Sequence, residues 1–249
     1  MKEIKIVDRE IDYFIERLSN KEYFSYSRFN DGELLCVVKE INNSEKISNG
    51  NCDGHLYYPD LAKELMISLT RSNCEDYFVQ YLGNWIRSKT FIDYTNMIQE
   101  RISMEGVYQY TEFIQLMFHK HPEKFKRFVD ILNQYDIMIV GPEYLEKIKF
   151  IKFSSFVKVP TKNCYNSKDS ILAEIRSKIS TGTIVLFSSS MATNVFIDEL
   201  YDDFGSNSFL IDVGSIWDIF FHNTNTEIKQ RTPNLDKLDD FKEWYKEYF

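Results

Sequence analysis

Residues 182–205 read GTIVLFSSSMATNVFIDELYDDFG, and the order of features in this stretch decides the fold. It opens with a short, continuous apolar run, which is typical of a strand buried on both faces of a sheet. A serine-rich turn and a helical segment follow. Residues 207–221, NSFLIDVGSIWDIFF, then predict a final strand with Asp212 and Gly214 at its end.

The same alternation runs through the residues that precede this stretch. Residues 136–148, DIMIVGPEYLEKI, combine a buried strand, a Gly-Pro turn and the start of a helix. SFVKVP at 155–160 predicts another strand, and DSILAEIRSKI at 169–179 predicts a helix with Asp169 or Ser170 as its cap. Apolar strands that alternate with helices favour an α/β fold with a Rossmann-like, mostly parallel sheet flanked by helices.

The first half of the chain has a less regular pattern. Apolar spacing predicts a helix at 8–19, a strand at 23–29, a helix from Pro59, a strand at 76–82 and broken helices over 91–120. The length of 249 residues suits one large domain, because single cores stop growing near roughly 250–300 residues.

We therefore expect a single domain over 1–249, with a weak seam near residue 120. The apolar run at 34–38 fits either a helix or a buried strand. The tail is expected to form a helix over 236–248 that packs back onto the body.

Composition excludes several classes of protein. Apolar residues make up 43% of the chain, which is enough for a buried core, and the net charge of −8 argues against non-specific nucleic-acid binding. The first residues, MKEIKIVDREIDYF, predict neither a signal peptide nor a transit peptide, and no stretch approaches the ~20 apolar residues of a membrane span. The cysteines show neither a zinc nor a disulfide spacing, which indicates reduced thiols; they are Cys36, Cys52, Cys74 and Cys164.

We accordingly expect a cytoplasmic protein without a nucleic-acid partner. Peripheral association with a membrane and assembly into a homo-oligomer are left open by the sequence.

Four polar turns fall where predicted strands end. They are Asp31-Gly32-Glu33, Gly141-Pro142-Glu143, Ser188-Ser189-Ser190 and Asp212-Val213-Gly214. Because ligands of Rossmann-like sheets bind at the carboxyl ends of strands, these turns are the candidate functional positions.

The first of these turns, Asp31-Gly32-Glu33, admits two interpretations. Carboxylates two positions apart point to the same side of an extended backbone, and two hard oxygen ligands suit Mg²⁺ or Mn²⁺. Asn, Asp and Gly are also the residues that a simple turn prefers. We expect the segment to be both a turn and a metal clamp, since two carboxylates this close would repel without a cation.

The surrounding stretch FSYSRFNDGEL, 24–34, resembles the RFGDGEL segment of bacterial glycosyltransferases of the GT-D type. The later segments IVGPEYLEKI, TIVLFSSSMATNVFIDEL and FLIDVGSIWD follow in the order and spacing of that family, so the resemblance covers about 24–218. The sequence departs from the family pattern at Asn30, where Gly is expected. Asn tolerates positive φ better than most residues, so the turn can be retained.

This resemblance implies roles for the residues that match the family motif. Asp31 and Glu33 would bind the metal and the donor diphosphate, with Gly32 keeping the approach open. Arg28 would be a phosphate or carboxylate partner, or alternatively a salt bridge that orients Asp31.

Other candidates lie in the loop at 48–61, SNGNCDGHLYYPDL. Asp53 and His55 form an Asp–His pair that could supply a general base, because His titrates near neutrality and a carboxylate raises its basicity. The alternative is an Asx-type turn that contains an incidental histidine.

The three serines and two further acids have paired interpretations as well. Ser188, Ser189 and Ser190 could bind a phosphate at a helix N-terminus, or only cap that helix. Glu143 could accept a hydrogen bond from a ribose or a base, or favour the helix dipole. Asp212 reaches the site or caps its own turn.

The resemblance, together with these candidate residues, implies a metal-dependent hexosyltransferase. It would use Mn²⁺ or Mg²⁺, take a nucleotide-diphospho-sugar such as a UDP-sugar, and glycosylate a hydroxyl of a glycan, glycolipid or glycoprotein. The alternatives are a Rossmann methyltransferase, weakened by the lack of a glycine-rich first turn, and a non-catalytic nucleotide-sugar-binding module.

Overall fold

The strands form one continuous sheet in the computed structural model, which describes residues 5–42, 59–71, 75–81, 89–104, 106–109, 112–221, 241 and 244. The order is β1-β4-β3-β2-β8-β7-β5-β6, and every neighbouring pair is parallel. The strands are β1 Lys5–Ile6, β2 Ser25–Phe29, β3 Tyr77–Tyr81, β4 Val107–Gln109, β5 Ile137–Gly141, β6 Ser155–Lys158, β7 Ile184–Phe187 and β8 Phe209–Asp212. The predicted α/β class with a parallel sheet is confirmed.

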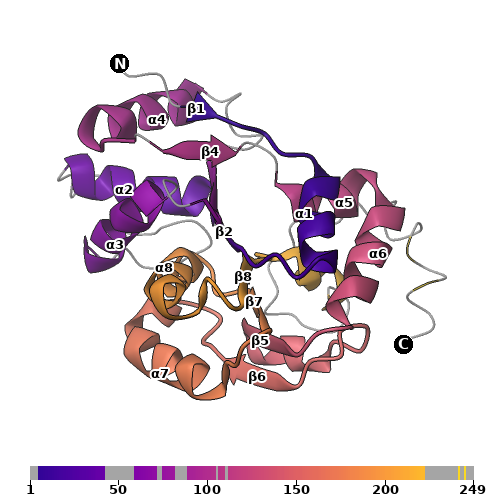
Figure 1. Cartoon of the computed structure of the whole chain (residues 1–249). Coiled ribbons are helices and arrows are strands. Elements are labelled where there is room, and N and C mark those ends of the chain that lie inside the picture. Colours follow the sequence, from indigo (N-terminus) through magenta and orange to yellow (C-terminus); the bar gives the residue numbers. More distant parts are fainter. Residues whose placement is uncertain are drawn as a thin grey trace.

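Helices connect the strands and cover both faces of the sheet (Figure 1). The α-helices are α1 Ile11–Ser19, α2 Asp31–Asn42, α3 Pro59–Thr70, α4 Lys89–Arg101, α5 Phe113–Lys120, α6 Pro122–Leu132, α7 Lys168–Lys178 and α8 Ala192–Phe204. Short 3₁₀ helices are η4 Glu143–Lys147, η5 Cys164–Ser167 and η6 Ile216–Phe221. No helix within the described ranges is both long and apolar enough to cross a bilayer.

The central strands divide their side chains between two separate cores. Ile137 and Ile139 of β5 pack with α1, α5 and α6, whereas Met138 and Val140 pack with α2, α3, α7 and α8. This follows from the two-residue period of a strand, which sends successive side chains to opposite faces. Because both faces are apolar, the strands appear in the sequence as continuous apolar runs.

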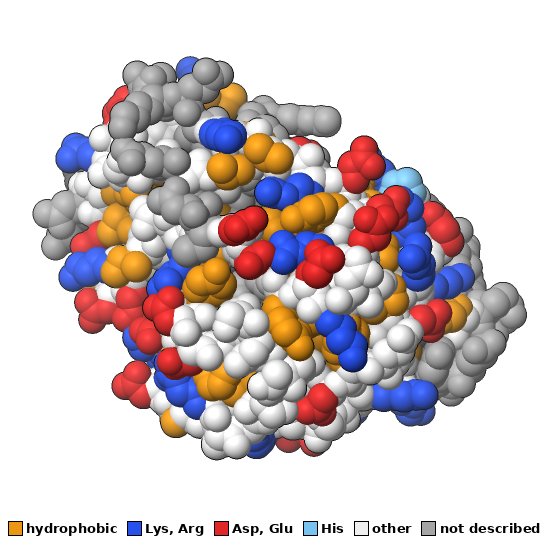
Figure 2. Space-filling view, viewed as in Figure 1, with side chains coloured by type: hydrophobic (Ala, Val, Ile, Leu, Met, Phe, Trp, Pro, Cys, Tyr) orange, Lys and Arg blue, Asp and Glu red, His pale blue; other side chains and the backbone are white. Residues whose placement is uncertain are grey.

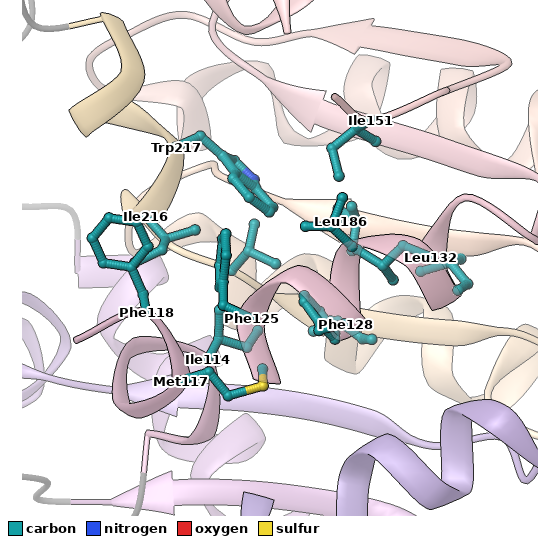
Figure 3. Packing of buried hydrophobic residues seen from close by; sticks show 14 of the residues in the cluster. Ile114, Met117, Phe118, Phe125, Phe128, Leu132, Ile151, Leu186, Ile216 and Trp217 are labelled. Carbon is teal, nitrogen blue, oxygen red and sulfur yellow. The ribbon is translucent and has the colours of Figure 1, made fainter. Parts of the chain in front are cut away.

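The core under α5 and α6 anchors the segment that follows β8. Trp217 of η6 is fully buried, and its ring lies 6.0 Å from that of Phe125 in α6. Figure 3 shows Trp217 facing Phe125 and Leu186 across this core. The turn between β8 and η6 is therefore held from both ends, by the sheet on one side and by aromatic packing on the other.

Charged side chains are mixed on the surface. Figure 2 shows one face of the molecule, on which acidic and basic side chains are interspersed and apolar ones form small separate patches.

Most predicted elements are present, and two predictions need correction. The helical region expected over 91–120 contains α4 and α5, but also the short strand β4, whose three residues, Val107–Gln109, left too little pattern to detect. The segment at 31–33, expected to be an extended turn, is the first turn of α2. The expected tail helix lies outside the described residues apart from Phe241 and Trp244, of which Phe241 stacks on Phe118 at 4.8 Å.

Candidate functional site at the carboxyl end of the sheet

The central strands β2 and β8 are neighbours in the sheet, and the chain leaves them in opposite directions. From β2 the chain continues into α2 over one face, whereas from β8 it continues into η6 over the other. Loops that leave neighbouring parallel strands in opposite directions create the crevice where α/β proteins bind ligands. Arg28 of β2 and Asp212 of β8 face this crevice from adjacent strands.

Arg28 is the centre of a nearly buried polar cluster. The residue is 9% exposed, and its Nη2 lies 3.0 Å from Glu112 Oε2 while its Nη1 lies 3.9 Å from Asp212 Oδ1. With its amide oriented to satisfy both polar atoms, Asn30 accepts from Arg28 Nη2 at 2.8 Å and donates to Glu112 Oε1 at 3.2 Å. Burial acts to lower the pKa of Arg28, but the Glu112 and Asp212 carboxylates offset this and raise it.

Gly214 makes room for this guanidinium. Its φ is +57°, and a Cβ at this position would overlap Arg28 Nη1. The Gly214 N–H donates to Asp212 Oδ1 at 2.8 Å, so the Asp212-Val213-Gly214 turn closes on itself while it contacts Arg28. Asp212 therefore both caps its own turn and reaches the cluster.

Asp31 and Glu33 enter the cluster from the first turn of α2, which corrects their expected geometry. Residues two apart on a helix do not face each other, so the two carboxylates do not lie side by side as they would on extended backbone. Glu33 Oε2 instead accepts from the Asn30 N–H at 2.9 Å, and the Leu34 N–H donates to the Asn30 carbonyl at 3.0 Å. The Glu33 bond is one half of a capping box, with Asn30 at the N-cap and its side chain directed to Arg28 and Glu112 instead.

Two of the carboxylates have raised pKa values. Burial raises the pKa of Glu33 to about 7, with the negative charges of Asp212 and Asp31 adding to the shift. Burial likewise raises the pKa of Asp212 to about 6, although Arg28 and the Gly214 N–H act in the opposite direction. Glu33, Glu112 and Asp212 thus share the single guanidinium of Arg28, and the cluster carries an excess of negative charge.

The described residues fit a divalent cation only as part of its ligand set. They contain no group of three or more His, Cys, Asp and Glu side chains that could hold a metal. Mg²⁺ at phosphate sites, however, is commonly bound through one or two carboxylates together with substrate phosphates and water. The crowded carboxylate of Glu33, with Asp31 on the same helical turn, has the chemistry of such an incomplete site.

The hydroxyl groups of two serines after β7 bind backbone carbonyls, and one of these carbonyls belongs to Gly214 beside Arg28. Ser188 Oγ donates to the Gly214 carbonyl at 2.7 Å, and Ser189 Oγ donates to the Val140 carbonyl at 3.2 Å. Ser190 is exposed with a φ of +54°. Helix α8 has Met191 at its N-cap without a side-chain capping bond. The N-cap of α8 is therefore Met191 and not one of the three serines, and phosphate binding by these serines stays a prediction.

Glu143 lies apart from the cluster. It follows β5, which is separated from β2 by β7 and β8, and its exposed carboxylate lies 2.7 Å from Lys158 Nζ. Lys158 lowers the pKa of Glu143. Asp53 and His55 lie outside the described residues, so their predicted role as a base stays a prediction.

The sequence did not reveal several members of the cluster. Glu112 and Gln115 come from the start of α5. With its amide oriented to satisfy both polar atoms, Gln115 also accepts from Arg28 through its side-chain oxygen. Gln80 of β3 is level with Arg28 in the neighbouring strand, and its amide atoms are buried with no hydrogen-bond partner among the described residues. Asn194 of α8 hydrogen-bonds the Arg28 backbone. An asparagine in the mostly apolar stretch MATNVFI was the one signal that could have been noticed.

The fold and the polar cluster define the class first: a doubly wound α/β protein with a nearly buried charged cluster at the ends of its central strands. Neither family models nor curated proteins match the sequence. Solved structures do match the fold.

Two matching structures are of the domain of unknown function 1792 (DUF1792), one of them reported to have a distinct glycosyltransferase fold. Each is 17% identical to this chain, with a TM-score of 0.60, and the match covers 89% of this chain and 83% of the other. A third, a glycosyltransferase (DUF1792) from Streptococcus sanguinis, is 15% identical with a TM-score of 0.61, and the match covers 96% of this chain and 97% of the other. The predicted resemblance to such transferases is confirmed at the level of the fold.

Proposed function

We propose that this protein is a glycosyltransferase that moves a hexose from a nucleotide-diphospho-sugar, with a UDP-sugar as the first candidate, to an acceptor hydroxyl. The observation that carries the proposal is the buried Arg28 cluster at the β2–β8 crevice, in a fold shared with a glycosyltransferase. The acceptor would be a glycan, glycolipid or glycoprotein. The spacing of the cysteines and the burial of Cys36 and Cys164 as free thiols support a cytoplasmic site of action.

The proposed reaction exchanges one bond to the sugar for another. The bond between the anomeric carbon and the diphosphate oxygen breaks, and its electron pair leaves with the nucleoside diphosphate. The acceptor oxygen forms the new bond to the anomeric carbon, and its proton passes to a base. Negative charge therefore grows on the leaving diphosphate, so groups that stabilise this charge accelerate the step.

Arg28 is suited to stabilise that charge. Its guanidinium is nearly buried and is held by Glu112, Asp212 and the Gly214 backbone, so it needs little rearrangement when charge develops nearby. The N-terminus of α2 opens beside it, and helix N-termini favour phosphate groups. A diphosphate oxygen would bind Arg28 without displacing Glu112 or Asp212, because a guanidinium has five N–H donors and can bind more than one oxygen.

Mn²⁺ or Mg²⁺ would be held by Asp31 and Glu33 together with the donor diphosphate, and it would supply Lewis-acid stabilisation of the leaving group. Glu33 is already fixed by its bond to the Asn30 N–H, so one carboxylate oxygen is oriented by the helix cap. Asp53 and His55 remain the proposed acceptor base.

Ligand binding tests the donor class. We expect UDP or another nucleoside diphosphate to raise the melting temperature in the presence of Mn²⁺ or Mg²⁺, and a chelator to reduce the effect. At ~100 times its Kd, a ligand stabilises by roughly 2.7 kcal/mol, which such a screen resolves readily. Stabilisation by S-adenosyl compounds, with none by any nucleoside diphosphate, would favour a methyltransferase and overturn the proposal.

Turnover then separates an enzyme from a binding module. A transferase releases the nucleoside diphosphate from its donor, slowly to water and faster to its acceptor. A protein that binds the nucleotide-sugar but releases no nucleoside diphosphate with any tested acceptor class would be a non-catalytic module.

A further inference from the structure

The two central strands separate before they reach the crevice. Among the described residues, the ladder between β2 and β8 ends with Tyr26 and Ile211, whereas β2 stays paired with β3 as far as Phe29 and Tyr81. β8 stays paired with β7 as far as Asp212. The carboxyl ends of β2 and β8 therefore form a fork.

The peptide groups of Arg28 point into this fork. The Phe24 carbonyl accepts from the Leu210 N–H at 3.2 Å, so the peptide groups of Phe24 point toward β8. Because this direction alternates along a strand, the peptide groups of Tyr26 and Arg28 point toward β8 as well. At Arg28 the backbone of β8 no longer provides a ladder partner among the described residues, although the Asp212 side chain of β8 interacts with the Arg28 N–H. A buried peptide group without a partner would cost free energy, so another group is needed here.

Asn194 of α8 takes the place of the missing strand. Its Oδ1 accepts from the Arg28 N–H at 3.1 Å, and its Nδ2 donates to the Arg28 carbonyl at 2.7 Å. The same Oδ1 accepts from Ser27 Oγ at 2.7 Å, and the Asn194 carbonyl accepts from Ser68 Oγ of α3 at 3.1 Å. The side chain is 1% exposed, so these bonds are shielded from water.

We propose that Asn194 is a positioning residue for catalysis, which replaces the β8 backbone as the partner of β2 and thereby holds Arg28 in register where the two strands separate. Pairing with β8 at this level would close the fork, whereas a side-chain amide fixes the same peptide groups while the ends of β2 and β8 stay apart. The proposal rests on the proposed transferase function, because it assigns Asn194 an effect on the leaving diphosphate through Arg28.

The chain contains a matched control for this arrangement. Asn133, after α6, donates from Nδ2 to the Phe150 carbonyl at 2.9 Å and accepts at Oδ1 from the Lys152 N–H at 2.7 Å. It therefore fixes a backbone segment in the same way. It does so next to the start of β5, at the amino ends of the strands, whereas Arg28 lies near their carboxyl ends.

Asn194→Ala and Asn133→Ala are compared for stability and turnover. Both variants should lower the melting temperature by about 3–10 °C, since each loses hydrogen bonds to the backbone. Only Asn194→Ala should lower kcat, by about 10–100-fold with a smaller change in donor KM, because misplacing a group that acts on the transition state affects the chemical step. Asn133→Ala should keep kcat/KM within about twofold.

A double-mutant cycle with Arg28→Lys tests whether Asn194 acts through Arg28. Lys keeps the charge but loses the rigid fork of the guanidinium. If Asn194 only positions that fork, adding Asn194→Ala to Arg28→Lys should lower kcat by less than threefold more. Additive losses, an unchanged kcat in Asn194→Ala, or an equal loss in Asn133→Ala would each overturn the proposal.

Hydrogen exchange provides a readout that does not depend on turnover. The Arg28 amide should exchange at least about tenfold faster in Asn194→Ala and remain unchanged in Asn133→Ala. If the wild-type protein transfers no sugar, the proposed function fails, and the catalytic role of Asn194 fails with it. Unchanged exchange of the Arg28 amide would show that Asn194 does not hold the Arg28 peptide group, whether or not the protein is active.

Discussion

The guanidinium of Arg28 occupies the space that a side chain at position 214 would need, so Gly214 and Arg28 are in direct backbone-to-side-chain contact. Replacing Gly214 by Ala should therefore displace Arg28 as well as strain a residue at positive φ. We expect the free energy of unfolding to fall by about 3 kcal/mol, from overpacking and left-handed backbone together, and transfer to fall by about 100-fold. Urea denaturation and donor turnover measure the two effects.

Gly182→Ala is the control for this substitution. Gly182 also has positive φ, +86°, but a Cβ there would meet only Tyr23 Oη, at 3.9 Å. This variant should lose about 1 kcal/mol and keep full turnover. Equal losses of turnover in both variants would show that backbone strain, and not the contact with Arg28, controls activity.

Asp31→Asn and Glu33→Gln test the proposed metal clamp. Both substitutions preserve size, and Gln keeps an oxygen for the capping bond to Asn30. Each should abolish the metal-dependent part of donor binding and lower transfer by at least ~100-fold, while stability is unchanged or slightly raised because repulsion with Asp212 is relieved. Titration calorimetry with and without chelator measures the binding.

Asp60→Asn is the matched control, since Asp60 also lies in the first turn of a helix, α3, but is paired with Lys63. Its donor binding should equal that of the wild type. If Asp31→Asn and Glu33→Gln unfold the protein while the folded fraction stays active, the pair is structural.

Gln80→Met should stabilise the protein. The buried amide of Gln80 has no partner among the described residues, and an unsatisfied buried polar group costs about 1–3 kcal/mol. Met has a similar shape without that cost, so the melting temperature should rise by about 2–4 °C. Gln134→Met on the exposed surface should change stability by less than about 0.5 kcal/mol. Destabilisation of Gln80→Met would mean that water or another group satisfies the amide in solution.

His55→Ala and Asp53→Asn should lower kcat more than they raise the donor KM, as expected for an acceptor-side base. The reason is the Asp–His pair in the predicted loop at 48–61. His121→Ala, at an exposed histidine before α6, is the control and should leave kcat unchanged. Full turnover of both loop variants with the natural acceptor would exclude the loop from catalysis.

Sequence alone could predict the parallel sheet because strands β5, β7 and β8 are apolar on both faces. It also placed Arg28 and Asp212 at strand ends, which the sheet order then brought together. The helical state of Asp31 and Glu33 was missed although its signal was present: Asn30 and Glu33 have the spacing of a capping box before an apolar run.

Other members of the site had no local signal. Glu112 follows β4, a strand too short to show a period, and it reaches Arg28 only through tertiary packing. Whether Asn194 would face solvent or the peptide of Arg28 depends on where β8 ends relative to β2. Such relationships come from register between strands, which the spacing of apolar residues along one segment does not encode.

The bond between Ser27 and Asn194 joins residues 167 positions apart, and it has a consequence for biosynthesis. A ribosome completes β2 long before it synthesises α8 and β8. Contacts between such distant segments form late, because closing the intervening loop costs entropy before any contact is gained. The nascent chain therefore cannot join its two central strands until β8 has been synthesised, and fragments that end before residue 209 lack that strand.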